Sequence, residues 1–166
     1  MKRSEHPVPP GFHTVTASLT VKDSAAAIDY YKKALGAEEI MRMASPDGKI
    51  THAELKIGDS IIFLNDEIPG WGSKAPETLS GVTGSIYLYV EDADKSFERA
   101  VGAGAKVVMP VMDMFWGDRL GSFVDPFGHA WAVSTHTQDM TEEEMEQGAK
   151  AFHAQMAQMA QQKKTA

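Results

Sequence analysis

The stretch "LYVEDADKSFERAVGAG", residues 88–104, decides the fold, because the chain contains a second version of it. The earlier version is "LTVKDSAAAIDYYKKALGA", residues 19–37, and Leu19 and Asp23 match Leu88 and Asp92 at one spacing of 69 positions. Each version begins with an apolar, strand-like run, continues through an acidic N-cap into helical periodicity, and stops at a glycine. The sequence therefore predicts a strand–helix unit that occurs twice, which is an internal repeat.

The residues after each version extend the repeat to a complete module. Strands are predicted at 37–43, 49–57 and 60–65 in the first half, and at 106–111 and on both sides of the "DPFG" turn (125–128) in the second. The turns contain the Pro, Asp and Gly residues that tight reversals need. The opening strands are expected at 13–21 and 85–90, with a loop at 66–83 between the halves. This order predicts an α+β fold of two tandem βαβββ modules, residues 13–66 and 84–137, after an arm of residues 1–12.

The last segment, residues 138–166, is predicted to form an amphipathic helix. Thr141 and Glu144 have the spacing of a capping box, in which each side chain bonds the other residue's backbone amide. An apolar seam follows at steps of four and three: Met145, Ala149, Phe152, Met156 and Met159. The seam either covers the protein's own sheet or packs on another subunit. Its methionines favour the second interpretation, because methionine adapts to irregular partners.

The composition excludes several classes of function. The 166 residues carry a net charge of −7 without a basic stripe, which argues against nucleic-acid binding. The absence of cysteine removes disulfides, thiolate zinc sites and cysteine nucleophiles. No apolar run approaches the length of a membrane span, and residues 1–14 lack the apolar region of a signal peptide. We therefore expect a cytoplasmic protein that binds neither nucleic acid nor a membrane.

Besides its two modules, the chain contains three informative motifs. These motifs are the "LTVKD" and "LYVED" junctions, the "YYKKALGAE" helix end and the final "GDRLGSFVDPFGHAW" (117–131). In these modules and motifs the chain resembles the vicinal-oxygen-chelate superfamily. That superfamily includes glyoxalase I, extradiol dioxygenases, fosfomycin-resistance thiol transferases and bleomycin-binding resistance proteins. The similarity is greatest to its PhnB-like branch and covers residues 12–137. The resemblance implies that the modules form an open barrel-like cup. In metal-dependent members, the cup holds one divalent metal through His, Gln or Glu side chains from four strands.

The metal positions that the resemblance implies carry weak or no ligands in this sequence. They fall on Thr16, on Ile62 or Phe63, on Ser85 and on Ala132. Hydroxyls are weak ligands, and methyl groups or rings do not coordinate such a metal. The resemblance therefore favours the bleomycin-binding type, which uses the cup as a metal-free groove between two subunits. We expect a homodimer that binds a small organic molecule and needs no cofactor.

Eight residues are predicted to line this cup and bind the ligand. Tyr87 and Tyr89 alternate with apolar residues, so they share a face with Ser85. In "FWGDRL" (115–120), the aromatic pair can form an apolar wall, and the Arg119 guanidinium can bind an anionic group. The alternative is a hairpin entry whose aromatic residues cap the core and whose Asp118 and Arg119 are exposed. The predicted lining is Thr16, Phe63, Ser85, Tyr87, Tyr89, Trp116, Arg119 and Trp131, for an aromatic or anionic ligand.

A competing hypothesis is an enzyme with a displaced divalent metal, of the lyase, isomerase or dioxygenase type. Its polar candidates are His52, Glu54 and His129. His52 and Glu54 are two positions apart on a predicted strand, so they project to one face. The simpler interpretation is a hydrogen-bonded pair there and a hydrogen-bonded His129 after its turn. A third hypothesis is a structural protein whose cup is filled by its own side chains. The sequence leaves open whether the chain is an enzyme.

Overall fold

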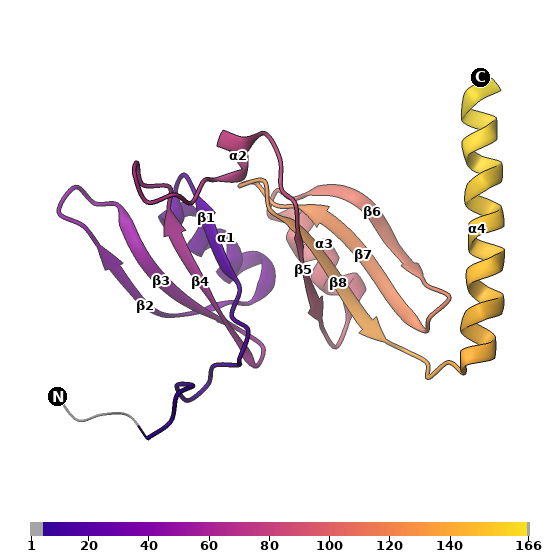
Figure 1. Cartoon of the computed structure of the whole chain (residues 1–166), viewed down its shortest axis with the longest axis horizontal. Coiled ribbons are helices and arrows are strands. Elements are labelled where there is room, and N and C mark those ends of the chain that lie inside the picture. Colours follow the sequence, from indigo (N-terminus) through magenta and orange to yellow (C-terminus); the bar gives the residue numbers. More distant parts are fainter. Residues whose placement is uncertain (1–4, 166) are drawn as a thin grey trace.

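The computed structural model describes residues 5–165 and contains two modules of the same element order (Figure 1). The first consists of β1 (Ser18–Val21), α1 (Ser24–Leu35), β2 (Glu38–Ala44), β3 (Ile50–Ile57) and β4 (Ser60–Asp66). After the short helix α2 (Pro76–Leu79), the second consists of β5 (Ser85–Tyr89), α3 (Ala93–Gly102), β6 (Lys106–Asp113), β7 (Asp118–Val124) and β8 (Ala130–His136). Helix α4 (Glu142–Thr165) follows. The predicted α+β fold with two tandem βαβββ modules is confirmed.

The structure differs from the prediction most clearly at the opening strand and in the loop between the two halves. The first strand begins at Ser18, not at residue 13. The amide of Phe63 donates to the carbonyl of Ala17 at 2.8 Å, and upstream the ring of Phe12 packs on that of Phe63 with centroids 5.7 Å apart. The expected loop at 66–83 contains α2, which begins at Pro76, because a proline suits the first helical position.

The two modules have the same sheet topology. The strand orders are β1-β4-β3-β2 and β5-β8-β7-β6. In each sheet the opening strand is parallel to the last strand of its module, and the other pairs are antiparallel. β1 and β5 therefore each occupy an edge of their sheet.

Equivalent aspartates begin the two long helices of the modules. The carboxylate of Asp23 accepts from the Ala26 amide, and that of Asp92 accepts from the Lys95 amide, both at 3.0 Å. These bonds satisfy amides that a helix leaves without a backbone partner. At the other end of α1, Gly36 takes a left-handed conformation with φ of 67°, which glycine adopts without steric cost. The predicted N-cap and stop of this helix are confirmed.

The modules are joined by a buried carboxylate, Asp125, in the turn between β7 and β8. It is 3% exposed and accepts hydrogen bonds from the Tyr31 hydroxyl at 2.7 Å and the Trp131 indole at 2.9 Å. It also accepts from the backbone amides of Phe127 and His129, each at 2.9 Å. Burial and the adjacent carboxylate raise the pKa of Tyr31, so its hydroxyl remains a donor. Helix α1 is thereby fixed to the second module.

The aromatic side chains around Asp125 form one core shared by both modules. The ring of Tyr31 lies 5.4 Å from that of Trp131 and 6.2 Å from that of Phe127. The Tyr30 hydroxyl donates to the Ala100 carbonyl of α3 at 3.4 Å, and α1 and α3 pack against each other near the middle of the molecule (Figure 1). Since the helices cover one face of each sheet, the opposite faces are left open.

Helix α4 stands away from both sheets (Figure 1). The predicted capping box is formed, with Thr141 Oγ1 accepting from the Glu144 amide at 3.3 Å and Glu144 accepting from the Thr141 amide at 2.8 Å. Farther along, Phe152 packs on Phe115 with centroids 5.8 Å apart. Gly148 permits this approach, because a Cβ there would lie 2.7 Å from the Phe115 Cβ. The first part of the seam therefore packs on the turn between β6 and β7; the Met159 side chain lies outside the described part.

Within residues 5–165, no helix is long and apolar enough to cross a membrane.

We predict that Asp125→Ala lowers the free energy of unfolding by about 3 kcal/mol or more, because several buried donors lose their acceptor at once. Tyr31→Phe removes one bond to a charged group and should cost about 1.5 kcal/mol. Urea denaturation followed by circular dichroism measures both. Glu98→Ala, on an exposed position of α3, is the control, with an expected change within about 0.5 kcal/mol. Equal effects of Asp125→Ala and Glu98→Ala would show that the carboxylate does not join the modules.

Candidate functional site

The open face of the second sheet brings together side chains from β5, β7 and β8. On β5, Ser85, Tyr87 and Tyr89 are exposed, whereas the alternating Ile86 and Leu88 are partly buried. The register then assigns the neighbours on this face: Ala130, Ala132 and Ser134 beside the β5 residues, and Asp118 beside His136. The face therefore combines two exposed aromatic side chains with a carboxylate and an imidazole.

Asp118 is the centre of this group and is 2% exposed. Its carboxylate accepts from the hydroxyls of Tyr87 at 3.1 Å, Tyr89 at 3.2 Å and Ser134 at 3.1 Å. His136 Nδ1 lies 2.8 Å from the other carboxylate oxygen. Burial alone would raise the pKa of Asp118, but these hydrogen bonds outweigh it and lower the pKa below its ordinary value. The group is therefore a carboxylate at neutral pH.

His136 links the buried carboxylate to the segment that leads into α4. Its Nε2 lies 3.0 Å from Asp139 Oδ1, opposite the contact of Nδ1 with Asp118. Both carboxylates can only accept, so the protonated imidazole satisfies both contacts. Hydrogen bonds to Asp139 and then Asp118 raise the pKa of His136 above its ordinary value.

The two tyrosines present their rings outward. Tyr87 and Tyr89 are 42% and 67% exposed, and their ring centroids lie 5.1 Å apart. Because both hydroxyl hydrogens point to Asp118, the tyrosines offer ring faces and oxygen lone pairs to a ligand and no free donor. Trp116, two residues before Asp118, contributes to the lowered pKa of that carboxyl, so this predicted residue belongs to the same group. At the edge of the sheet the tyrosines border a cleft of about 850 Å³, whose other walls come from α3 and the turn between β3 and β4.

The open face of the first sheet carries a smaller polar pair. His52 Nε2 lies 3.3 Å from Glu54 Oε1, and the His52 ring packs on Phe63 with centroids 4.9 Å apart. The register places Met43 opposite His52. Thr16 precedes β1, is partly buried, and its hydroxyl bonds the His13 carbonyl at 3.5 Å. The structure thus places His52 and Glu54 together on one face, as their spacing indicates.

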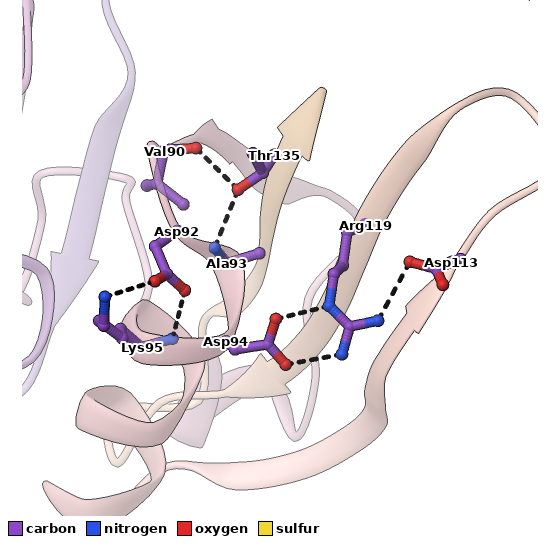
Figure 2. A network of polar contacts seen from close by, with 8 residues as sticks. All are labelled: Val90, Asp92, Ala93, Asp94, Lys95, Asp113, Arg119 and Thr135. Atoms are coloured by element: carbon purple, nitrogen blue, oxygen red, sulfur yellow. Dashed lines mark hydrogen bonds and ion pairs between the residues drawn. The ribbon is translucent and has the colours of Figure 1, made fainter. Parts of the chain in front are cut away.

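Arg119 and Trp131, two of the predicted lining residues, lie on the helix-covered side. Arg119 donates to Asp94 of α3 at 2.7 Å and to Asp113 at 3.0 Å, and Figure 2 shows its guanidinium enclosed by both. Trp131 is 1% exposed and bonded to Asp125. Arg119 follows Asp118 and Trp131 precedes Ala132, both of which lie on the open face. Neighbouring residues on a strand point to opposite faces, so Arg119 and Trp131 point away from it. The structure therefore corrects the predicted lining by these two residues.

Asp118, Ser134 and His136 are the functional candidates that the sequence analysis missed. Only the alternative interpretation of "FWGDRL" assigned a position to Asp118, an exposed one, and the structure buries it. Ser134 and His136 could have been found from the alternation of side chains along a strand, because Ala132 was already expected to point into the cup. Two and four positions later, Ser134 and His136 share its face.

The residues present do not fit the divalent metal of the superfamily. Thr16, Phe63, Ser85 and Ala132 offer hydroxyls, a ring and a methyl group in place of imidazole and carboxylate. His129, the third candidate for a displaced site, has its Nε2 3.0 Å from the Thr20 carbonyl at the module junction. Across residues 5–165, no group of three or more His, Asp or Glu side chains is arranged to hold a metal ion.

The geometry predicts that His136 titrates above its ordinary value of 6.5. A pKa raised on folding means that the imidazolium bonds stabilise the fold fully below 6.5, and that this contribution is lost as pH rises through the folded-state pKa. Proton NMR of the imidazole Cε1–H resonances measures the titration, with His136→Gln to assign the signal. Asp139→Asn should lower the pKa toward 6.5. A midpoint at or below 6.5 that Asp139→Asn leaves unchanged would contradict the bridge.

Comparisons with known proteins give the family. An uncharacterized protein of Mycobacterium bovis is 43% identical over 131 residues, which cover 77% of this chain and 86% of the relative. The structure of TioX from Micromonospora sp. ML1 is 27% identical with a TM-score of 0.58, covering 74% of this chain and 97% of TioX. The PhnB protein from Bacillus cereus, 16% identical, shares the fold with a TM-score of 0.58 and covers 74% of this chain and 99% of its own.

Residues 11–133 match the family model of the Glyoxalase/Bleomycin resistance protein/Dioxygenase superfamily. The match spans more than half of the chain and agrees with the two βαβββ modules, so the chain belongs to this superfamily.

Proposed function

We propose that this protein binds a small organic molecule on the open face of its second sheet, without a divalent metal and as a homodimer. The observation that carries the proposal is the tyrosine pair, Tyr87 and Tyr89, exposed on a sheet face and anchored to the buried Asp118. Small-molecule sites are mostly apolar surfaces with a few well-placed polar groups. This face has that composition.

The anchoring of the tyrosines supports binding more than it supports a structural role. A hydrogen bond from each hydroxyl to Asp118 restricts both rings while leaving them exposed, so a ligand would bind to a surface that is already ordered. The adjoining cleft of about 850 Å³ has room for a compound of drug-like size.

The arrangement of charges favours the aromatic part of the sequence-based expectation over the anionic part. Arg119 was the expected anchor for an anion, and its guanidinium is instead bound by Asp94 and Asp113. The open face itself contains Asp118, which repels anions. A planar aromatic molecule stacked on the tyrosines is the ligand class that these contacts support.

A second copy of the chain is the proposed cover for the open faces. Large apolar side chains stand exposed on the edge strands of both sheets: Ile40 and Met43 on β2, Val107, Val108 and Met112 on β6. An edge strand with exposed apolar side chains is a surface that another chain can cover. The relation to bleomycin-binding proteins, whose groove lies between two subunits, supports the same arrangement.

The binding proposal predicts that planar aromatic compounds stabilise the native protein. In a thermal-shift assay, indole or quinoline should raise the unfolding temperature in proportion to occupancy, because each binds only the folded state. Tyr89→Ala should weaken binding about tenfold, since aromatic contacts contribute about 0.5–1.5 kcal/mol beyond the area that they bury. Leu79→Ala removes an exposed apolar side chain on α2, away from both open faces, and should leave binding unchanged.

Two outcomes would contradict this function. One is equal binding by wild type and Tyr89→Ala. The other is a stoichiometric divalent ion that persists through purification without chelator and whose removal by EDTA abolishes binding.

The dimer is tested by placing a charge on an open face. Met43→Asp should shift the equilibrium to monomers in sedimentation velocity, because the interface would have to desolvate a carboxylate. Leu79→Asp, on exposed α2, should leave the dimer intact. A wild-type chain that sediments as a monomer at high micromolar concentration would overturn the proposal.

A further inference from the structure

We propose that the Tyr87–Tyr89 face selects organic cations, in particular a quaternary or substituted ammonium group next to an aromatic ring. This inference rests on the proposed function and names the ligand class of that site. It follows from three features of the face: the exposed rings, the orientation of their hydroxyls, and the charge of the side chains around them.

The first feature is the pair of rings. Tyr87 and Tyr89 have centroids 5.1 Å apart and planes tilted by 50°, so they form two adjoining walls. A cation over such ring faces is attracted by their electron density, and recognition of quaternary ammonium groups uses aromatic walls of this kind. Trp116, which helps to lower the pKa of the same carboxyl, adds a third aromatic side chain to the group.

The second feature is the direction of the hydroxyl hydrogens. Both hydroxyls donate to Asp118, at 3.1 and 3.2 Å, so the oxygens present lone pairs to a ligand. A phenol that donates to a carboxylate also becomes more electron-rich, which strengthens its attraction for a cation. An anion would find no free hydroxyl donor on this pair.

The third feature is the charge of the surroundings. Asp118 is flanked by His136, and His136 by Asp139, so the group is negative whether or not the imidazole is protonated. In the adjoining cleft, Lys95 pairs with Asp92 at 2.8 Å, and the remaining charged lining residues are Asp59, Glu91 and Arg99, so the lining has a net negative charge. The whole chain has a net charge of −7, so the long-range field also attracts cations.

The position of His136 makes this selectivity depend on pH. The charged groups that face it are Asp118 of β7 and Asp139 before α4, and through Asp118 it adjoins the hydroxyls of Tyr87 and Tyr89. Protonated His136 neutralises part of the charge that a ligand cation would meet. Binding of the cation should therefore strengthen as the pH rises and His136 loses its proton.

The test compares three compounds that share a benzyl group: benzyltrimethylammonium, benzyl alcohol and benzylsulfonate. Isothermal titration calorimetry on the full-length chain at pH 8 should show that the cation binds at least tenfold more tightly than the alcohol, and the sulfonate most weakly. Asp118→Asn, with a side chain of the same shape, should reduce the advantage of the cation to threefold or less. Tyr89→Leu should remove most binding of the cation.

A second measurement keeps the result independent of folding defects. His136→Gln should bind the cation equally at pH 5.5 and pH 8, whereas wild type binds it several times more tightly at pH 8. Glu98→Gln, a charge change on exposed α3, is the matched control and should behave as wild type.

The proposal is overturned if the three compounds bind equally, if Asp118→Asn retains the full preference in a folded protein, or if none of them binds. Equal binding that still requires Tyr89 would leave the proposed function intact and reject only the selectivity for cations. No binding by these compounds, together with none by indole or quinoline, would reject both.

Discussion

The buried carboxylate of Asp125 is the interaction on which the arrangement of the chain depends. It receives a hydroxyl from α1, an indole from β8 and two amides of its own turn. A buried carboxylate is costly unless such donors surround it, so these partners are held at fixed positions. The first module meets the second through this group and through the aromatic rings packed around it.

Each module also has a side chain that hydrogen-bonds the start of its helix to its last strand. The two side chains occupy equivalent positions of the repeat but differ in chemistry. In the first module, Asp66 accepts from the amides of Ser24 and Ile50, at 2.7 and 2.8 Å. In the second, the Thr135 hydroxyl accepts from the Ala93 amide and donates to the Val90 carbonyl, both at 2.9 Å (Figure 2). Each joint ties the start of a helix to the last strand of its module. With one face of each sheet committed to a helix, the other is available for binding.

The fold could be predicted from the sequence because the two copies of the repeat support the same assignment of strands and helices. Asp23 and Asp92 cap their helices as their spacing predicts, and Ser85, Tyr87 and Tyr89 alternate as expected. The site was harder to predict, because a shift of one position along a strand moves a side chain to the opposite face of the sheet. Asp118 and Arg119 are adjacent and equally polar, and only the pairing of β7 with β8 shows that Asp118 faces the tyrosines and Arg119 faces α3. On the side that faces α3, Asp94 and Asp113 then bind the Arg119 guanidinium.

The central claim is that the tyrosine face, organised by Asp118, is the ligand-binding surface. The most direct measurement is an NMR titration of isotope-labelled protein with benzyltrimethylammonium, recorded with intermolecular nuclear Overhauser effects. If the ligand binds there, the N-methyl protons contact the rings of Tyr87 and Tyr89, and the amide signals of β5, β7 and β8 shift. Contacts confined to the separate cavity of about 450 Å³ lined by Ile68 and Trp71 would contradict it.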